Sequence, residues 1–377
     1  MSSTRTRVLL AVLALVSLAA VFSTRVSQRM PDFEVYRTAG ARAMAAAPLY
    51  REDDGHYQFK YLPAFALLAS PIALLPDLAA KAAWFAVSAV LMVVLLGLSL
   101  RALPEIRRPQ WLLIFLTFLA MAKFYAHELL LGQVNLLFAV VVVLAIVSMR
   151  GGREAAAGLL LALSVVVKPY GVLFMPWLAT RRTRVAAVTM VAGLAVLLLL
   201  PAVRYGWSGN LDLLAGWWHT VTSTTAPNLQ NPDNVSLQSM FTRWLGPDSP
   251  ARTLAAMVSV VLLALAAIVM AGRGALKVPD TLEGSLLLLM IPLLSPQGWD
   301  YVLLISTPAV MLLINYLDSL PRGLRVMTAV SIAVIGLAIY DVIGRDAYRA
   351  FMRLSFITIL AIIQIAALVT LRFRRAA

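Results

Sequence analysis

The feature that most constrains this chain is a series of long, uninterrupted apolar stretches. Val185–Val203, Met257–Ala271 and Leu354–Leu371 are examples. Stretches that approach about 20 residues match the hydrocarbon thickness of a bilayer. Inside lipid every backbone N–H and C=O must be paired within its own segment, so these stretches are expected to be helices. The chain is 61% hydrophobic and only 13% charged, far from the composition of a soluble domain. The sequence therefore predicts an all-α polytopic membrane protein, with residues 1–377 forming a single integral membrane domain.

Hydropathy divides this domain into about twelve transmembrane helices. The apolar stretch from Val8 to Phe22 looks like a signal peptide, but no A-x-A-like cleavage site follows it, so we interpret it as an uncleaved first helix. The expected spans are 8–24, 82–100, 111–127, 133–149, 155–168, 169–180, 185–203, 253–271, 281–295, 299–317, 325–343 and 354–372. An even number of crossings puts both termini on the same side. The pair 155–168 and 169–180 is interrupted at Lys168-Pro169 and is compatible with a bent hairpin or with one broken helix.

Arginines set the expected orientation, because short cytoplasmic loops are enriched in Lys and Arg. With the amino terminus inside, Arg107, Arg108, Arg150, Arg153 and Arg372 all fall on short inner segments. This threading leaves two long segments on the outer face, a first outer loop at 25–60 and a second outer loop at 204–252.

The segment 61–76 is apolar but contains Pro63, Pro71 and Pro76. If it crossed the bilayer, the loop with Arg107 and Arg108 would move outside. We therefore expect a re-entrant or interfacial segment, since broken backbone at membrane depth is tolerated where it lines a protein cavity.

Several classes of chemistry have no support in the sequence. There are no cysteines, and the three histidines His56, His127 and His219 stand far apart, without zinc-like spacing. No phosphate-binding glycine loop is present. The net charge of +14 is explained by arginines that flank the helices, so we expect no nucleic acid partner.

Two carboxylates, Asp32 and Glu34, stand just beyond the first expected helix, at the outer membrane face. They are candidate catalytic acids. The alternative for Asp32 is a helix N-cap, whose side chain accepts a backbone N–H. The alternative for Glu34 is a first-turn acid that interacts favourably with the helix dipole.

Cations and aromatic residues follow at the same expected face. Lys60 and Tyr61 lie at the interface, where a lipid phosphate would be, although an interfacial lysine can also simply extend towards water. Lys168 interrupts an apolar stretch, and a lysine inside the membrane usually faces a cavity or an anionic partner.

The remaining candidate substrate-binding residues lie at expected outer helix junctions or in the second outer loop. Polar side chains that enter a helix often serve interhelical hydrogen bonds instead. These candidates are Gln133, Asn135, Asn234, Arg243, Trp299, Asp300 and Tyr301. Together the candidates suggest an outward-facing cavity that suits a sugar carried on a lipid phosphate. A transporter more often places its ionisable groups in the middle of helices, in two related repeats.

The order of six short motifs resembles glycosyltransferase family 87, a family that includes polyprenyl-phosphate-mannose-dependent α-mannosyltransferases. Each motif is weak alone, but six in the expected order are fairly specific, and together they extend over most of the chain. The motifs begin at Asp32 (D-F-E-V-Y), Phe59 (F-K-Y-L-P), Gly132 (G-Q-V-N), Lys168 (K-P-Y), Asn234 (N-V-S-L) and Ser295 (S-P-Q-G-W).

The resemblance implies a GT-C-like helical bundle with its active site at the outer face. Asp32 matches the position of the family's catalytic acid, and Glu34 completes a D-x-E form of its acidic motif. One departure concerns Tyr301, because family members often carry a histidine at this point.

We therefore expect an inverting, metal-independent membrane hexosyltransferase of the bacterial plasma membrane, without a cofactor. Its donor is expected to be a polyprenyl-phosphate sugar, with mannose the favoured hexose, and its acceptor a lipid-linked or cell-envelope glycan. Lys60, Lys168 or Arg243 is expected to hold the donor phosphate. The rival interpretations are a lipid or solute transporter and, with less support, a non-catalytic assembly subunit.

Overall fold

A computed structural model describes the backbone of residues 3–180, 184–272 and 278–374. In these three ranges the regular structure is helical throughout, and no strand occurs apart from one isolated bridge between Asn234 and Trp299. The predicted all-α fold is confirmed. It follows from the solvent, since a helix pairs its backbone groups within a single segment.

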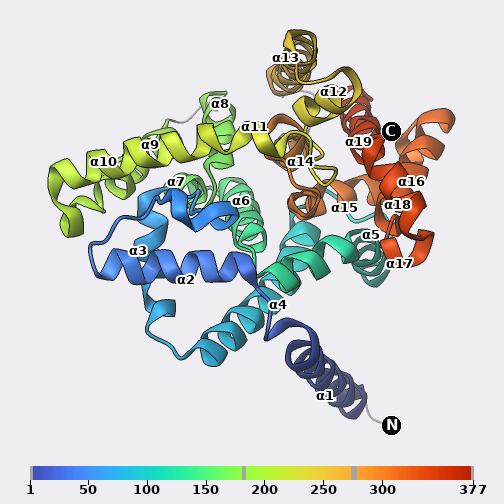
Figure 1. The fold of residues 1–377 in the computed structure, drawn as a ribbon. Helices are drawn as coiled ribbons and strands as arrows, with labels where there is room; N and C mark the ends of the chain where they lie inside the picture. Colours follow the sequence, from blue (N-terminus) through green and yellow to red (C-terminus); the bar gives the residue numbers. More distant parts are fainter. Residues whose placement is uncertain (1–2, 181–183, 273–277, 375–377) are drawn as a thin grey trace.

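The helices of the first half bring the chain from the amino terminus to the middle of the sequence (Figure 1). Their bounds are α1 Ser3–Val21, η1 Phe22–Val26, α2 Pro31–Met44, η2 Glu52–Tyr57, α3 Pro63–Ala73, α4 Asp77–Ala102, α5 Gln110–Leu131, α6 Asn135–Arg150, α7 Glu154–Val167, η3 Pro169–Leu173, α8 Phe174–Ala179 and α9 Val185–Leu199.

The second half is built in the same way. Its bounds are α10 Ala202–Ser223, α11 Thr225–Asn228, α12 Leu237–Leu245, α13 Ser249–Ala271, α14 Pro279–Leu294, η5 Asp300–Ser306, α15 Thr307–Asn315, η6 Leu317–Ser319, α16 Arg322–Leu337, α17 Tyr340–Ile343, α18 Arg345–Arg353 and α19 Phe356–Phe373.

The predicted count of about twelve crossings is not confirmed. Among the described residues, four helices are long and apolar enough to cross a bilayer, namely α4, α5, α13 and α19. A fifth span is possible if α9 and the following helix are taken together, but they are bent by 92°. Most other apolar segments form shorter helices: α6 has 16 residues and α7 has 14, which at 1.5 Å per residue is about 21–24 Å.

Two of the long helices keep much of their apolar surface uncovered by protein. Val90 and Val93 of α4 are 61% and 65% exposed, and Val260 and Val261 of α13 are 64% and 56% exposed. Contiguous apolar surface of this kind is costly in water. It supports the conclusion that the chain is a membrane protein, with lipid covering these faces.

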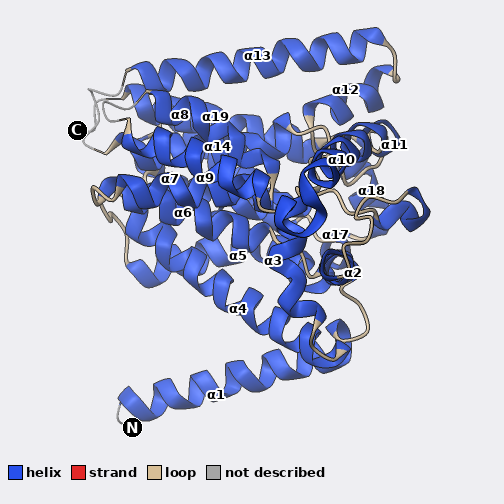
Figure 2. Cartoon of the chain, turned by 90° about the vertical axis from the view of Figure 1, so that its left-hand side faces the viewer, coloured by secondary structure: helices blue, strands red, loops and turns tan. Residues whose placement is uncertain are grey.

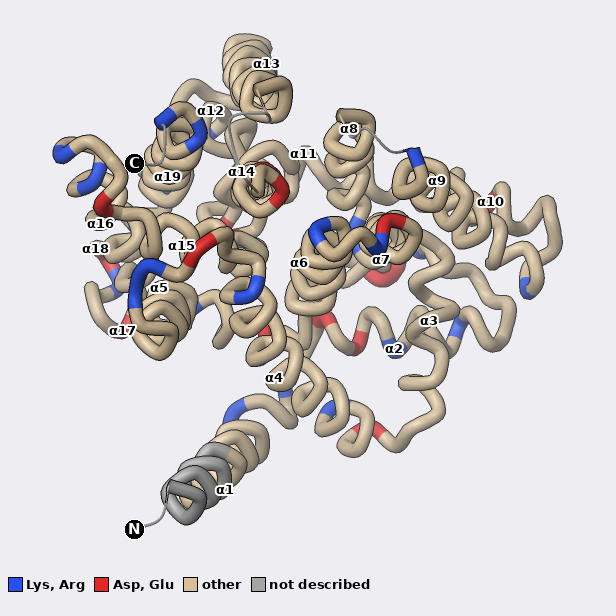
Figure 3. The backbone as a smooth tube through the Cα atoms, turned by 180° about the vertical axis from the view of Figure 1, so that it is seen from behind, with Lys and Arg blue, Asp and Glu red and all other residues tan. Residues whose placement is uncertain are grey.

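The molecule has two distinct ends (Figure 2). The chain begins α1 and finishes α19 at one end, whereas α2, α10, α11, α17 and α18 lie at the other. Figure 3 shows that most charged residues sit near helix ends or in connections rather than along the helices.

We call the end with the termini the arginine-rich end, defined by Arg107, Arg108, Arg150, Arg372 and Arg374. These side chains tie neighbouring connections together. The Arg107 guanidinium donates to the Ser319 hydroxyl at 2.8 Å, the Arg108 guanidinium pairs with Asp318 at 2.5 Å, and Arg372 donates to the Val269 carbonyl at 3.1 Å.

Two ambiguous segments of the sequence are short pieces in the structure. In 61–76 the helix α3 has 11 residues, or about 17 Å, too short to cross; it packs against α2. The re-entrant interpretation stays a prediction. In 155–180 the chain breaks at Lys168, which is extended (φ −149°, ψ 127°). The following η3 lies back against α7, where a side chain on Gly171 would collide with Ser164.

We predict that the end opposite the arginine-rich end faces the outside of the cell. The chain lacks cysteine, so single cysteines at Asp53 and Gln230 can be labelled cleanly, and both should react with an impermeant thiol reagent on intact cells. A cysteine at the exposed Glu105 should react only after permeabilisation. Labelling of position 105 on intact cells would contradict the orientation.

Candidate active site

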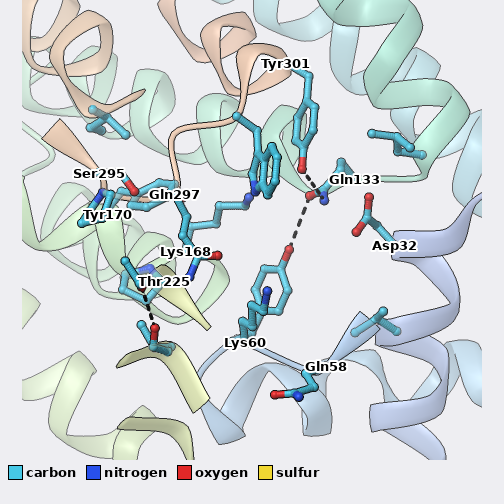
Figure 4. Close-up of a pocket in the computed structure, with 18 of the residues that line it drawn as sticks. Asp32, Gln58, Lys60, Gln133, Lys168, Tyr170, Thr225, Ser295, Gln297 and Tyr301 are labelled. Carbon is cyan, nitrogen blue, oxygen red and sulfur yellow. Dashed lines mark hydrogen bonds between the residues drawn. The ribbon is translucent and has the colours of Figure 1, made fainter. Parts of the chain in front are cut away.

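A cavity of about 750 Å³ is lined in part by α2 and α10, which lie at the end opposite the arginine-rich end (Figure 2). Its walls come from helix ends and breaks rather than from helix faces. They include the start of α2, the loop before α3, the α5–α6 junction, the break at Lys168, the loop around Asp233 and the turn that leads into η5. Figure 4 shows Asp32, Lys60, Lys168 and Tyr301 facing a common space around Gln133.

Asp32 enters the cavity because α2 begins at its edge. Pro31 occupies the first helical turn, and Met30 precedes it in a left-handed conformation (φ 67°). The Met30 N–H donates to the Leu130 carbonyl of α5 at 3.1 Å. Gly132 ends α5 at φ 70°, and a side chain there would strike Met30 and Phe33. This close contact positions the start of α2.

The N-cap alternative for Asp32 is wrong. Met30 occupies the cap position and no side chain caps the helix. Instead Asp32 lines the cavity, where burial raises the pKa of its carboxyl above the ordinary range. A hydrogen bond from Gln133 and the charges of Lys168, His56 and Lys60 act in the opposite direction and lower it in part. A buried carboxylate with a raised pKa is a stronger proton acceptor than an exposed one.

Gln133 organises the aromatic wall beside Asp32. The Tyr36 hydroxyl donates to Gln133 Oε1 at 2.9 Å and lies 2.8 Å from the Tyr61 hydroxyl. On its other side the Gln133 Nε2 donates to the Tyr301 hydroxyl at 3.4 Å (Figure 4). Burial raises the pKa of Tyr61 to about 12, so its hydroxyl stays protonated and can serve as a hydrogen-bond donor.

Lys168 places a buried ammonium in this cavity. The residue is only 7% exposed, and its Nζ lies 5.7 Å from the ring centre of Tyr61 and 5.6 Å from that of Tyr170. No carboxylate in the described ranges lies within 4 Å of this nitrogen. Lys60 also lines the cavity, and burial lowers the pKa of its amine. The buried Lys168 and the half-buried Lys60 have no carboxylate at ion-pair distance in the described ranges, which is costly and favours a site for an anion.

A short bridge holds the two loops on the opposite side of the cavity. Asn234 pairs with Trp299, the Val235 N–H donates to the Gly298 carbonyl at 2.7 Å, and the Asp300 N–H donates to the Asp233 carbonyl at 2.8 Å. We call this contact the loop latch. It brings the backbones of Asp233 and Asp300 into contact at the cavity wall, which both residues line.

The turn at Trp299 carries two further contacts. The Trp299 and Tyr301 rings are nearly parallel, with an interplanar angle of 7° and centroids 6.5 Å apart. His127 of α5 brings its Nδ1 to 3.7 Å from Asp300 Oδ1, and its ring lies 6.4 Å from that of Tyr301. The structure therefore supplies an imidazole beside Tyr301, where the resemblance drawn from the motifs suggested a histidine.

Four candidates from the sequence lie outside the cavity lining. Glu34 forms ion pairs with Lys81 at 2.9 Å and Arg37 at 3.8 Å, as expected of a first-turn acid. Asn135 donates to the buried Glu128 at 2.8 Å. The other two, Asn234 and Arg243, belong to the loop latch and its support.

Arg243 supports the latch from behind. Its guanidinium donates to the carbonyls of Asn231 and Asn234 at 2.9 and 2.8 Å and to the Ser355 hydroxyl at 2.7 Å. Burial lowers the pKa of Arg243 to about 10. These contacts hold a loop and leave the two lysines as the cations that face the cavity.

Several lining residues are not among the candidate site residues chosen from the sequence, namely Tyr36, His127, Tyr170, Trp217 and Asp233. Asp233 directly precedes the motif that starts at Asn234, and Tyr36 is the last residue of the motif that starts at Asp32. His127 lies six residues before Gln133, at the end of the expected span 111–127 that precedes it. Each of these three residues lies close in sequence to a chosen candidate, and this proximity could have indicated that it also lines the cavity.

Comparison with protein families gives one match. The model of glycosyltransferase family 87 matches residues 59–296, which is more than half of the chain and includes four of the six motifs in full. The resemblance inferred from the motifs is confirmed. Comparisons with curated proteins and with solved structures gave no match.

We predict that Asn234→Ala destabilises the protein. The Asn234 amide donates to the carbonyls of Asn228 and Pro296 at 3.1 and 2.8 Å, and its oxygen accepts the Ser236 N–H at 3.0 Å. Each buried group left unpaired costs about 1–3 kcal/mol, so thermal unfolding in detergent should start at a clearly lower temperature. Asn231→Ala removes one hydrogen bond, to the Asp233 N–H at 2.9 Å, and should change stability much less. Equal effects would contradict the latch.

Proposed function

The chain belongs to glycosyltransferase family 87 and is therefore a membrane glycosyltransferase, and we propose that it transfers a hexose, with mannose favoured, from a polyprenyl-phosphate donor. The acceptor is a lipid-linked or cell-envelope glycan. The reaction inverts the configuration at the anomeric carbon and needs neither metal nor cofactor.

The observation that carries this proposal is the juxtaposition, in one cavity, of a half-buried carboxylate with a raised pKa and two lysines, one buried and one half-buried, without a carboxylate at ion-pair distance in the described ranges. Asp32 supplies a base, and Lys60 and Lys168 supply positive charge close enough to it to lower its pKa in part. A glycosyl phosphate needs both functions at once, a proton acceptor for the incoming hydroxyl and a counter-charge for the departing phosphate.

The reaction follows from these roles. The acceptor hydroxyl oxygen attacks the anomeric carbon, and its proton passes to an Asp32 carboxylate oxygen. The bond between the anomeric carbon and the phosphate oxygen breaks, and the bonding electrons leave with the polyprenyl phosphate. Lys60 and Lys168 stabilise the negative charge that grows on this leaving group. Lys60 and Lys168, rather than Arg243, are therefore the residues that we propose to hold the donor phosphate.

The site also fits a substrate that is half lipid. The cavity lies at the end of a helical body whose apolar faces are exposed to lipid, so a polyprenyl chain can stay in the bilayer while its phosphate reaches the lysines. We propose that the arginine-rich end is cytoplasmic, because short inner loops are enriched in arginine. The active site then opens on the outer face of a bacterial plasma membrane.

The rival interpretation as a transporter finds less support. The ionisable groups that line the cavity lie near helix ends at the end opposite the arginine-rich end, whereas a transporter binds its substrate near the middle of the membrane, between related repeats. If the protein were only an assembly subunit, Lys60 and Lys168 would face the cavity without an anion to bind.

We predict that purified protein in detergent releases polyprenyl phosphate from polyprenyl-phosphate mannose when an acceptor is present. Product is measured by transfer of radiolabelled sugar, and a chelator should leave the rate unchanged. A transporter needs two compartments and should give no turnover in detergent. Strict dependence on added Mn²⁺ would contradict the role given to the lysines.

We predict that Asp32→Asn lowers turnover by about 10²–10⁴-fold, the usual contribution of general-base catalysis. Asparagine preserves the size of the side chain, so folding and donor binding should be kept. Transfer rate, thermal stability and donor binding are measured on the same preparation. Glu34→Gln, which alters the ion-pair group outside the cavity, should have a milder effect. An Asp32→Asn enzyme with more than about a tenth of normal turnover would exclude Asp32 as the base.

A further inference from the structure

The cavity is divided by charge. Lys60 and Lys168 lie near Asp32, close enough to lower its pKa. A different part of the lining carries Asp233, Asp300 and His127, which we call the acidic wall. The proposed transfer uses Asp32 and the two lysines and gives the acidic wall no role.

Backbone contacts of the fold hold the acidic wall together. The loop latch joins the Asp233 carbonyl to the Asp300 N–H at 2.8 Å, so the two carboxylates come from adjacent backbone positions. Burial, followed by the charge of Asp300, raises the pKa of Asp233. Like charges held this close oppose each other. His127 Nδ1 lies 3.7 Å from Asp300 Oδ1, and His127, Lys123 and Arg243 are close enough to lower the pKa of Asp233 in part.

The chemistry of the acidic wall selects its ligand. Ionised carboxylates only accept hydrogen bonds, and an imidazole can donate or accept, so a ligand rich in neutral hydroxyl groups fits them. A phosphate is repelled. The stacked Trp299 and Tyr301 rings border the same part of the cavity and offer apolar surface to the C–H face of a sugar ring. The described residues contain no group of three side chains suited to a metal ion, so a cation is not the favoured occupant.

The stereochemistry of the proposed reaction places this ligand. In an inverting displacement the attacking hydroxyl approaches the anomeric carbon from the side opposite the departing phosphate. With the phosphate held by the lysines, the acceptor enters from the part of the cavity away from them. Gln133 connects the two parts, because its amide contacts both Asp32 and Tyr301. A hydroxyl bound near the aromatic pair can therefore reach the base.

We propose that Asp233, Asp300 and His127 form the acceptor subsite, and that this subsite takes a neutral, polyhydroxylated headgroup, a sugar unit, rather than an anionic one. The proposal rests on the proposed glycosyl transfer for its placement of donor and acceptor.

Asp233→Asn is the sharpest test. The latch uses the backbone oxygen of Asp233, so the variant keeps the loop while it removes one negative charge from the wall. With octyl α-mannoside as acceptor, its acceptor KM should rise about tenfold, which corresponds to about 1.4 kcal/mol, while the donor KM stays unchanged. Asp53→Asn is the matched control, because Asp53 is 87% exposed, pairs with Arg51 and lies outside the cavity.

A binding measurement separates this proposal from the catalytic one. Trp217 and Trp299 line the cavity, so tryptophan fluorescence in a sugar-free polyoxyethylene detergent can follow titration with octyl α-mannoside and, separately, with farnesyl phosphate. Asp233→Asn should weaken binding of the mannoside but not of the phosphate. If this holds although no transfer occurs, the sugar subsite stands and the proposed transfer fails.

Two results would overturn the acceptor subsite. One is an unchanged mannoside affinity and acceptor KM in Asp233→Asn. The other is a weakened donor with an unchanged acceptor, which would assign the wall to the donor sugar. If Asp233→Asn does not fold, His127→Gln alters the same wall from α5 without touching the latch, and the same weakening of mannoside binding is expected.

Discussion

The need to pair every backbone polar group in a lipid environment governs this structure. Long helices meet that need alone, so chain breaks are acceptable only where other protein groups or a cavity receive them. The breaks beside Met30, Gly132, Lys168 and Pro296 all gather at one end of the molecule. Each brings a polar side chain to the same cavity, which is why the site consists of helix ends. The polar lining of the cavity and the irregular backbone around it thus both follow from where the helices break.

Most of the secondary structure followed from the sequence, but the number of crossings did not. Hydropathy detects which residues avoid water, and every apolar span expected from it is mostly helical in the described ranges. It does not detect where a helix stops. The expected span 299–317 contains η5 and α15 in succession, and α9 ends at a bend of 92°. Such breaks depend on contacts with distant segments, which no local pattern of apolar residues records.

The candidate site was predictable at the level of motifs and less so at the level of residues. Within D-F-E-V-Y, Asp32 faces the cavity while Glu34, two residues later on α2, faces Lys81. Asn234 is buried in the loop latch, whereas its neighbour Asp233 lines the cavity. A motif marks a place where the chain must be specific, and both contact with a ligand and support of a loop demand specificity. Only the direction of each side chain separates these roles, and that direction is set by the helix start or by the latch.

The polar groups of the cavity show why one substitution in a motif does not by itself decide chemistry. Tyr301 stands where the resemblance drawn from the motifs suggested a histidine, yet His127 of α5 reaches the same part of the cavity and lies 3.7 Å from Asp300. An imidazole is thus available from a helix far away in the sequence. Its pairing with a buried carboxylate also restrains the orientation of the ring, so that it can act on a ligand without reorganisation at the moment of binding. In the reaction we propose, the charge-divided cavity, more than any single motif residue, therefore sets which end of a glycosyl phosphate faces the lysines and which side is left for an attacking hydroxyl.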